Sequence, residues 1–427
     1  MSLADAYGME RSYYSATANP FTAASRLEGD HCADVVVIGG GYTGLHAALQ
    51  ASSRGYSVIL LEAVRVGWGA SGRNGGQMIP GWRKGPGELI ERFGYDTARR
   101  LFDLSLEARA LTLETIERFG IACSVRSNGH LLVAARSRDL AAMRAEADTL
   151  TRKMAYPHVR ILNAQEVEAK LTVSGMHGGL LDEGGGHLHP LNYALGLADA
   201  AQRSGVRLFE GSPVLTIDLS KGVNVCTPAG TVKARYGVLA CDALLGKLFG
   251  PIAGRIMPVA NYLVATAPLK SGRSLIADDL AVSDSRFVVN YFRMSEDGRL
   301  IFGGGERYTV QPPRDIAGFG RRHMLRLFPQ LRETPVTYAW GGLVSVTLTR
   351  LPHIGRERDL FFAHGYSGQG VLIAALAGKV ISEAMTGAAE RFDVLSSLAP
   401  PEFPGGTWLR APLYVLGMLW YALRDRL

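Results

Sequence analysis

The feature that most constrains this chain is a run of β-branched residues followed at once by glycines. Val35-Val36-Val37-Ile38 is typical of a strand buried on both faces. The next six residues, Gly39-Gly40-Gly41-Tyr42-Thr43-Gly44, match G-x-G-x-x-G, and a helical stretch follows to about Arg54. In this context the first glycine makes a tight turn, the second admits a pyrophosphate, and the third lets the helix pack on the strand. The segment therefore predicts a dinucleotide-binding unit.

A second buried strand, from Ser57 to Leu61, completes the βαβ unit and ends directly before Glu62. A carboxylate about 20 residues after the glycines accepts hydrogen bonds from ribose hydroxyls, and a pyrophosphate rests on the N–H groups that begin the helix. The unit alone does not separate NAD from FAD. The cofactor contacts expected from it are Gly39, Gly41, Tyr42, Thr43, Gly44, Glu62 and Ala63.

A glycine-dense loop from Arg65 to Gln77 follows and carries hydroxyl, guanidinium and amide donors. Because glycine lets backbone approach a ligand closely, such a loop can run alongside an extended cofactor. The loop and the first motif together resemble the glycine oxidase/D-amino-acid oxidase superfamily of flavoproteins. There the first motif holds the ADP half and this loop runs toward the flavin, so the resemblance implies FAD.

The resemblance runs nearly end to end and sharpens toward one branch, the bacterial γ-glutamylputrescine oxidoreductases of polyamine breakdown. The segments that carry it are 12–14 (SYY), 178–191 (GGLLDEGGGHLHPL), 347–355 (TLTRLPHIG), 365–371 (GYSGQGV), 403–406 (FPGG) and 423–426 (LRDR). It implies an FAD-dependent amine oxidoreductase. The first candidate reaction is deamination of γ-glutamylputrescine or a related γ-glutamylated polyamine to an aldehyde, ammonia and hydrogen peroxide.

Two other activities stay open on the same sequence. One is a D-amino-acid or sarcosine-type oxidase, and the other is a dehydrogenase that passes electrons to a membrane acceptor. Some oxidases of the superfamily activate O2 with a Lys over the flavin, and this chain has no Lys between Lys270 and Lys379. The electron acceptor, O2 or another molecule, is therefore not fixed by the sequence.

Further cofactor contacts are implied by the resemblance, position by position. They are Ser71, Arg73, Asn74, Gly76 and Gln77 near the isoalloxazine or the phosphates, Val214 at the adenine, Ala240 at the pyrophosphate, and Gly342, Gly365, Ser367, Gly368, Gln369 and Gly370. Cys241 stands where the family often has a glycine. The glycines at 368 and 370 open a helix, whose first N–H groups suit the negative charge on the pyrimidine edge of a reduced flavin.

The attachment of the flavin is also implied by comparison with the superfamily. Several relatives tether it covalently through a Cys late in the chain or a His in the second loop. This chain has no Cys after Cys241 and no His between His46 and His130. We therefore expect FAD to be bound noncovalently.

Catalytic side chains are less constrained, because the cofactor carries the hard chemistry in such enzymes. His187 and His189 precede a helix and either contact the substrate or stabilise their loop. Tyr262 and Tyr291 lie on expected strands and either wall the flavin or pack in the core. Arg350 either pairs with a substrate carboxylate in a bidentate manner or forms a surface ion pair.

Composition excludes several other classes of protein and site. The net charge of +7 is spread along the chain without a basic run, so nucleic acid is not an expected partner. The four cysteines share no paired spacing, so the sequence predicts no metal site. Scattered cysteines also fit a cytoplasmic location. The apolar stretch Pro412 to Leu423 predicts a buried terminal helix, because a transmembrane span needs roughly 20 residues.

The expected fold class is α/β (α+β overall), a Rossmann-type FAD-binding domain interleaved with an antiparallel-sheet substrate domain. We expect helices over 88–119 with a break at Gly94, and over 190–204, 316–328 and 370–386, a hairpin turning at Asn128-Gly129, and a strand through Phe287-Val288-Val289. The expected division is an arm (1–32), an FAD-binding domain (33–120, 190–240 and 341–398), a substrate domain (121–189 and 241–340), and a C-terminal linker with an apolar helix (399–427).

Overall fold

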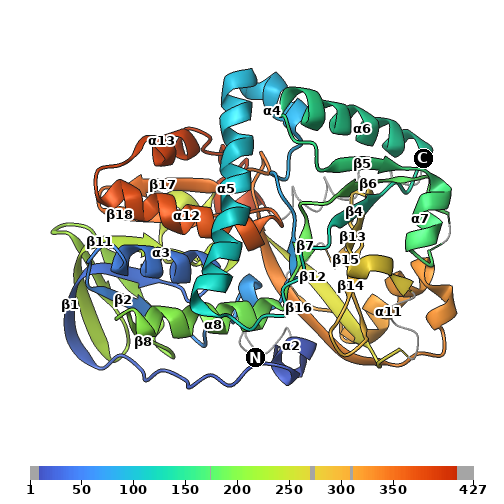
Figure 1. Cartoon of the computed structure of the whole chain (residues 1–427). Coiled ribbons are helices and arrows are strands. Elements are labelled where there is room, and N and C mark those ends of the chain that lie inside the picture. The colour runs from blue at the N-terminus through green and yellow to red at the C-terminus, as the bar shows by residue number, and fades with distance from the viewer. Residues whose placement is uncertain (1–8, 174, 270–274, 308–310, 411–427) are drawn as a thin grey trace.

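The computed structural model describes residues 9–173, 175–269, 275–307 and 311–410. Two sheets lie side by side, the first on the left of Figure 1 and the second on the right, and the long helix α5 (Tyr95–Phe119) stands between them. The fold class is the one predicted. The expected terminal helix at 412–423 lies outside the described residues.

The first sheet contains the dinucleotide-binding unit. Its main path has the strand order β17-β18-β11-β1-β2-β8, and its core ladders are parallel. Its strands are β1 (Gly29–Ile38), β2 (Val58–Leu61), β8 (Arg207–Phe209), β9 (Thr216–Asp218), β10 (Val223–Cys226), β11 (Gly230–Leu239), β17 (His353–Glu357) and β18 (Leu360–His364). Residues Val35 to Ile38 are almost fully buried, as expected of a strand covered on both faces.

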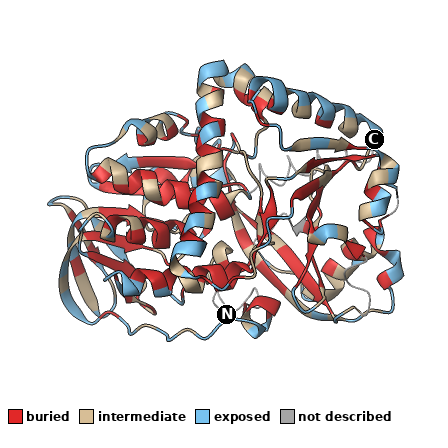
Figure 2. Cartoon of the chain, in the orientation of Figure 1, coloured by how far each residue is buried: buried red, intermediate tan, exposed pale blue. Residues whose placement is uncertain are grey.

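The third glycine of the motif explains how the first helix fits this sheet. A Cβ at Gly44 would collide with the carbonyl oxygen of Gly39 and lie 3.1 Å from Val37 Cγ1. Only glycine therefore lets helix α3 (Tyr42–Ser52) lie this close to β1. Figure 2 shows α3 and α12 (Gly370–Met385) buried along much of their length, beside the buried strands of this sheet.

One further helix packs on α3, and another packs on α5. Helix α8 (Pro190–Arg203) buries Tyr193 and a series of alanines, and α4 (Pro86–Phe93) precedes α5. The predicted break at Gly94 is confirmed, because that residue separates α4 from α5 with φ +79°. Glycine adopts such a conformation without the steric cost of a side chain.

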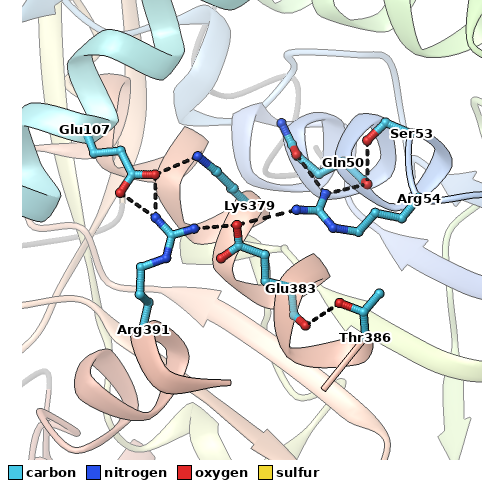
Figure 3. A network of polar contacts seen from close by, with 8 residues as sticks. All are labelled: Gln50, Ser53, Arg54, Glu107, Lys379, Glu383, Thr386 and Arg391. Carbon is cyan, nitrogen blue, oxygen red and sulfur yellow. Dashed lines mark hydrogen bonds and ion pairs between the residues drawn. The ribbon is translucent and has the colours of Figure 1, made fainter. Parts of the chain in front are cut away.

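Four helices are held together at one edge by an ionic network (Figure 3). Glu107 of α5 accepts from Lys379 of α12 at 2.6 Å and from Arg391 of α13 (Glu390–Ser396). Arg391 also pairs with Glu383, which accepts from Arg54 at the end of α3 at 3.4 Å. Burial opposes ionisation of Glu107, but the two cations outweigh it and lower its pKa.

The second sheet, eight-stranded within the described residues, has the order β16-β12-β15-β14-β13-β4-β6-β5. Its strands are β4 (His130–Val133), β5 (Val159–Leu162), β6 (Gly179–Asp182), β12 (Met257–Thr266), β13 (Ala281–Asp284), β14 (Tyr291–Met294), β15 (Leu300–Arg307) and β16 (Val336–Val346). Its ladders are antiparallel apart from β4 with β13. Helix α11 (Ile316–Leu327), which confirms the helix expected there, contributes Met324 and Leu327 to its core.

Two local predictions in this half of the chain were wrong. Asn128-Gly129 does not turn a hairpin, because Arg126 bridges to His187 while His130 pairs with Asp182 and Ala281. Tertiary pairing of the buried strand β4 overrides the local turn signal. The residues 287–289 are not a strand; they lie in the connection between β13 and β14, and Phe287 and Val289 line a cavity.

The smaller described elements are η1 (Met9–Arg11), α2 (Tyr13–Ala16), η2 (Ala70–Gly72), β3 (Gln77–Met78), α6 (Ser137–Asp148), η3 (Thr149–Lys153), α7 (Ala164–Lys170), β7 (Gly186–His187), η4 (Asp242–Leu244), α9 (Gly250–Ala253), η5 (Ala277–Asp279) and η6 (Pro329–Leu331). Within the described ranges, no helix has the length and apolar character that a membrane span requires. We propose that the two sheets are the centres of the predicted FAD-binding and substrate domains.

Candidate active site

Two cavities lie between the sheets and meet along a shared wall. The first has a volume of about 460 Å³ and the second about 410 Å³. The shared wall consists of Ala70, Arg73, Asn74, Gly342, Leu343, Val344, Ser367, Gly368 and Val371. The first cavity opens at the carboxyl ends of β1, β2 and β11, where open parallel sheets bind nucleotides.

The glycine motif forms one end of the first cavity. Gly39 has φ +112°, and a Cβ there would lie 2.6 Å from the carbonyl oxygen of Ala240. The N–H group of Tyr42 donates to Ser71 Oγ at 2.9 Å, and a Cβ at Gly41 would lie 2.9 Å from the same oxygen. The second loop thus packs directly on the start of α3, and the following helical N–H groups suit an anion.

Glu62 lies beside these glycines and is held by the backbone. Its Oε2 accepts from Gly40 N–H at 2.7 Å, and its Oε1 accepts from Val64 N–H at 2.8 Å. Burial raises its pKa, although both hydrogen bonds act in the opposite direction. Each carboxylate oxygen has a second lone pair. The side chain is therefore fixed in place with acceptor capacity for a pair of ribose hydroxyls.

The far side of the first cavity is built at the end of β11. Ala240, Cys241 and Asp242 all line it, as does Val214 from the connection after β8. Asp242 has φ +45°, its Oδ1 accepts from Gly365 N–H at 2.9 Å, and burial raises its pKa. The sequence analysis missed Asp242, since a carboxylate at this position has no counterpart in the motif.

Arg73 fixes the loop that separates the two cavities. Its Nε donates to the Trp68 carbonyl at 2.5 Å and its Nη1 to the Gly341 carbonyl at 3.1 Å. The indole N–H of Trp340 donates to the Arg73 carbonyl at 3.0 Å. Asn74 holds the same loop through donation to the carbonyls of Ala70 and Ser71, both at 3.0 Å. Arg73 thus lines both cavities while its bonds secure the wall.

The start of helix α12 forms the opposite side of that wall. Ser367 has φ +53° and its N–H donates to the Ser345 carbonyl at 2.9 Å. Gly368 has φ +97°, and a Cβ there would meet nothing within 4 Å. Gly370, the first residue of α12, lines the first cavity, and Gln369 lines the second. The helix N-terminus therefore faces the place where the cavities join.

The predicted cofactor contacts divide into three groups by position. Those that line the first cavity are Gly39, Gly41, Tyr42, Thr43, Glu62, Ala63, Ser71, Arg73, Asn74, Val214, Ala240, Gly342, Ser367, Gly368 and Gly370. Gln77 and Gln369 line the second. Gly44, Gly76 and Gly365 line neither and lie behind the walls, where they allow close packing of backbone. No contact with FAD is thereby established; these remain predictions.

Two of the five catalytic candidates line the second cavity, Tyr291 and Arg350. The Tyr291 hydroxyl donates to Asn261 Oδ1 at 2.6 Å, and its ring packs so closely on Gly75 that a Cβ there would lie 2.6 Å from Cε2. Arg350 stands on a turn with φ +62°. Both are placed to contact a ligand beyond the loop 70–75.

The other three candidates lie outside both cavities. His189 caps α8, since its Nδ1 accepts from Asn192 N–H at 3.1 Å, and burial lowers its pKa to about 3. His187 Nε2 lies 2.9 Å from the carbonyl of Asp279, and burial lowers its pKa. Tyr262 is fully buried with its ring edge-on to Phe319 at 5.4 Å. The geometry favours the loop-stabilising and core-packing roles for these side chains.

A buried arginine that the sequence analysis did not single out supports the loop from behind. Arg293 Nε donates to the Gly75 carbonyl at 2.8 Å, and its Nη2 donates to the Leu188 carbonyl at 3.0 Å and to the Tyr14 hydroxyl at 3.3 Å. Tyr14 also packs edge-on to Trp340 at 5.0 Å. The segment 12–14, which carries part of the family resemblance, was the sequence signal for this region. Its Tyr14 contacts Arg293 behind the cavity wall.

Comparison with known proteins agrees with this geometry. The family model described as FAD dependent oxidoreductase matches residues 34–384. The chain is 38% identical to gamma-glutamylputrescine oxidoreductase of Escherichia coli (strain K12), over 97% of this chain and 98% of the relative. It is also 38% identical to a protein of Rhizobium meliloti (strain 1021) named "Probable oxidoreductase OrdL", over 97% of each.

Solved structures show the same fold at lower identity. Glycine oxidase from Geobacillus kaustophilus superposes with a TM-score of 0.74 at 23% identity, covering 88% of this chain and all of that one. L-proline dehydrogenase from P. horikoshii gives 0.72 at 20% identity, covering 86% of this chain and 96% of that one. These solved structures thus share the fold of this chain.

Proposed function

The chain belongs to the family of FAD-dependent oxidoreductases. We propose that it oxidises the primary amine of a γ-glutamylated polyamine, with γ-glutamylputrescine as the first candidate. The observation that carries the proposal is the shared wall. A substrate in the second cavity would meet a cofactor in the first along the wall that contains Arg73, Asn74, Gly342 and Gly368. The name of the 38% identical relative supplies the substrate class.

The residues of the first cavity fit FAD. Gly39 and Gly41 provide backbone that a side chain would obstruct, Glu62 provides a fixed carboxylate, and α3 and α12 begin at the cavity. We propose that Glu62 holds the ribose, that the α3 N-terminus holds the pyrophosphate, and that the α12 N-terminus lies by the pyrimidine edge of the flavin. Bound FAD supplies the hydride acceptor. Noncovalent binding predicts that acid or heat releases the yellow colour from the polypeptide.

The chain's own contribution to the reaction is orientation and proton control. A primary amine has a pKa of about 10.4 in solution and enters as an ammonium, whereas departure of a hydride from the adjacent carbon requires the nitrogen lone pair. The second cavity disfavours the ammonium, because arginines line it together with apolar residues such as Leu343 and Val371. The tail of the substrate extends toward Arg350, which fixes the distance of the reacting carbon from the shared wall.

The products and the acceptor are tested together. With O2 as acceptor, the reaction gives an aldehyde, ammonia and hydrogen peroxide. Flavin reduction is followed anaerobically by stopped flow with γ-glutamylputrescine, putrescine, sarcosine and D-alanine, and peroxide is then measured in air. We expect γ-glutamylputrescine to reduce the flavin fastest and to yield peroxide. Faster reduction by sarcosine or D-alanine contradicts the polyamine assignment, and reduction without peroxide in air contradicts O2 as acceptor.

The same proposal includes a cytoplasmic location. Cys32, Cys123, Cys226 and Cys241 are all free thiols in the structure. Unpaired cysteines are typical of proteins kept in a reducing compartment. Fractionation of cells of the source organism, with activity assayed in each fraction, tests this directly. Activity confined to another fraction contradicts it.

A further inference from the structure

The charged side chains that line the second cavity are all cationic. Five of its lining side chains are cationic: Arg73, Arg83, Lys84, Arg286 and Arg350. None of its lining residues in the described part of the chain is Asp or Glu. A ligand carboxylate therefore finds partners in this cavity, and a ligand ammonium meets like charge.

Two of these arginines are placed to bind an anion. Arg286 Nη1 donates to Asp284 Oδ2, and Asp284 is fully buried and also accepts from Asn290 Nδ2 at 2.7 Å. That bond orients the guanidinium and uses one of its five donors. Arg350 lines the same cavity, and within the described residues its guanidinium forms no hydrogen bond or ion pair. Both groups therefore retain donors for a carboxylate.

Resting on the proposed function, we propose that the substrate is a diamine acylated by a dicarboxylic acid, and that Arg286 and Arg350 recognise its distal carboxylate. The α-ammonium of a glutamyl tail finds no anionic partner among the described lining residues. The lining offers such an ammonium only neutral acceptors, such as the oxygens of Ser283 and Gln369, and its cations repel the charge. The α-amino group therefore weakens binding, and a glutaryl tail, which lacks it, is bound more tightly.

The same cations act on the amine that reacts. The charged or titratable side chains that line the cavity are Arg73, Arg83, Lys84, Arg286 and Arg350, together with the phenol of Tyr291. Two of these cations have carboxylate partners just outside the lining, since Lys84 pairs with Glu88 and Arg286 pairs with Asp284. Like charge nearby favours the neutral amine, which is the form with a free lone pair. Removal of one arginine therefore weakens carboxylate binding and also moves the pH at which the amine loses its proton upward.

The first experiment compares three reductants of the holoenzyme under anaerobic conditions. They are γ-glutamylputrescine, the same molecule without its α-amino group (glutarylputrescine), and putrescine. The apparent Kd comes from the concentration dependence of flavin reduction. We expect glutarylputrescine to bind about tenfold more tightly than γ-glutamylputrescine, the size of one unpaired polar group, and putrescine to bind most weakly. Tighter binding of γ-glutamylputrescine than of the glutaryl compound overturns the proposal.

The second experiment uses Arg286→Gln and Arg350→Gln. Each variant should raise the Kd of glutarylputrescine about tenfold, as expected for the loss of a charge-assisted hydrogen bond, and should not raise that of putrescine, whose ammonium groups lose a like-charged neighbour. Each should also shift the pH midpoint of flavin reduction upward, which a change in packing alone does not do. Arg152→Gln is the matched control, because Arg152 is highly exposed, pairs with Asp148 and lines neither cavity. Unchanged carboxylate preference in both variants contradicts the assignment.

A measurement without turnover separates this inference from the proposed function. Glutarate and glutamate are titrated into the oxidised holoenzyme while the flavin absorbance spectrum is recorded. We expect glutarate to perturb the spectrum at about tenfold lower concentration than glutamate. If no acylated diamine reduces the flavin, the proposed function is wrong, and the glutarate titration still decides the chemistry of the cavity. If the diamines react but glutarate and glutamate bind equally, the inference alone is wrong.

Discussion

The two cavities share a wall but are lined by different kinds of residue. The first is formed largely by backbone and small side chains, with Gly39, Gly41, Ala240 and Gly370 at its ends. The second is lined by long side chains on loops and strand ends, such as Arg83, Arg286 and Arg350. Positions that require glycine are few and leave a pattern in the sequence, whereas many sequences can place a cation at the same point in space. The residues of the first cavity are therefore largely predictable from sequence, and those of the second are predictable only in part.

The largest effect is expected from a side chain added at Gly44, where only glycine lets α3 pack on β1 beside the first cavity. Gly44→Val places a Cβ against the carbonyl oxygen of Gly39 and near Val37 Cγ1, so α3 cannot pack on β1. We expect complete loss of FAD, measured as flavin absorbance per mole of purified protein. Gly87→Ala is the control, because a Cβ at that position meets nothing within 4 Å. A fully flavinated Gly44→Val protein contradicts the packing argument.

The second cavity should affect the pH dependence of flavin reduction rather than the stability of the fold. Only the neutral amine reacts, so the rate of anaerobic flavin reduction should rise about tenfold per pH unit below the pKa of the bound amine. The positive lining of the cavity lowers that pKa below the solution value of about 10.4. The rate should thus level off before pH 10. A midpoint at or above the solution pKa of the same amine contradicts this account of the cavity.

A moderate effect is expected from the carboxylate that both motif and structure place in the first cavity. Glu62→Ala should weaken FAD binding by about 1–3 kcal/mol, the range for loss of charge-assisted hydrogen bonds. The Gly40 and Val64 N–H groups also lose their acceptor. The Kd is measured by titration of the apoprotein with FAD. Glu62→Gln separates charge from hydrogen bonding, and unchanged affinity in both variants contradicts ribose binding by Glu62.

The smallest effect is expected away from both cavities, in the network of Figure 3. Glu107→Gln should lower the free energy of unfolding by about 1 kcal/mol, because the network is partly exposed. The pKa of Glu107 is lowered in the folded state, so its contribution is present above its ordinary value of 4.5 and is lost as pH falls through the folded-state pKa. Denaturation at pH 7 and at pH 3 should show a larger difference at pH 7 than at pH 3. An equal difference at both pH values contradicts an ionic origin.

The sequence predicted the parts of the fold that local backbone rules decide. The motif at 39–44, Glu62, the break at Gly94 and the helix beginning at Gly370 all follow from such rules, and each has the expected position. The prediction failed at Asn128-Gly129, where strand β4 pairs with strands far away in the chain. A turn signal acts over a few residues, and sheet pairing can override it.

The candidate site was predictable only in part for the same reason. Tyr291 and Arg350 were found, but His187 and His189 were proposed on their closeness to a helix start, and the structure uses His189 to cap that helix. Arg286 and Arg293 carry no motif. Their positions depend on the neighbours that orient them, Asp284 in one case and the carbonyl of Gly75 in the other. Such pairings exist only in the folded chain.

The first cavity also has a consequence for the order of events during synthesis. Its lining residues range along the chain from Ile38 at the end of β1 to Ala374 in α12. A ribosome that adds about 5–20 residues per second needs roughly 20–70 s to pass from one to the other. During that interval the glycine motif has left the ribosome without the opposite wall of its cavity. The cavity is thus complete only after Ala374 has been synthesised, and we expect a chain truncated before that residue to bind no FAD.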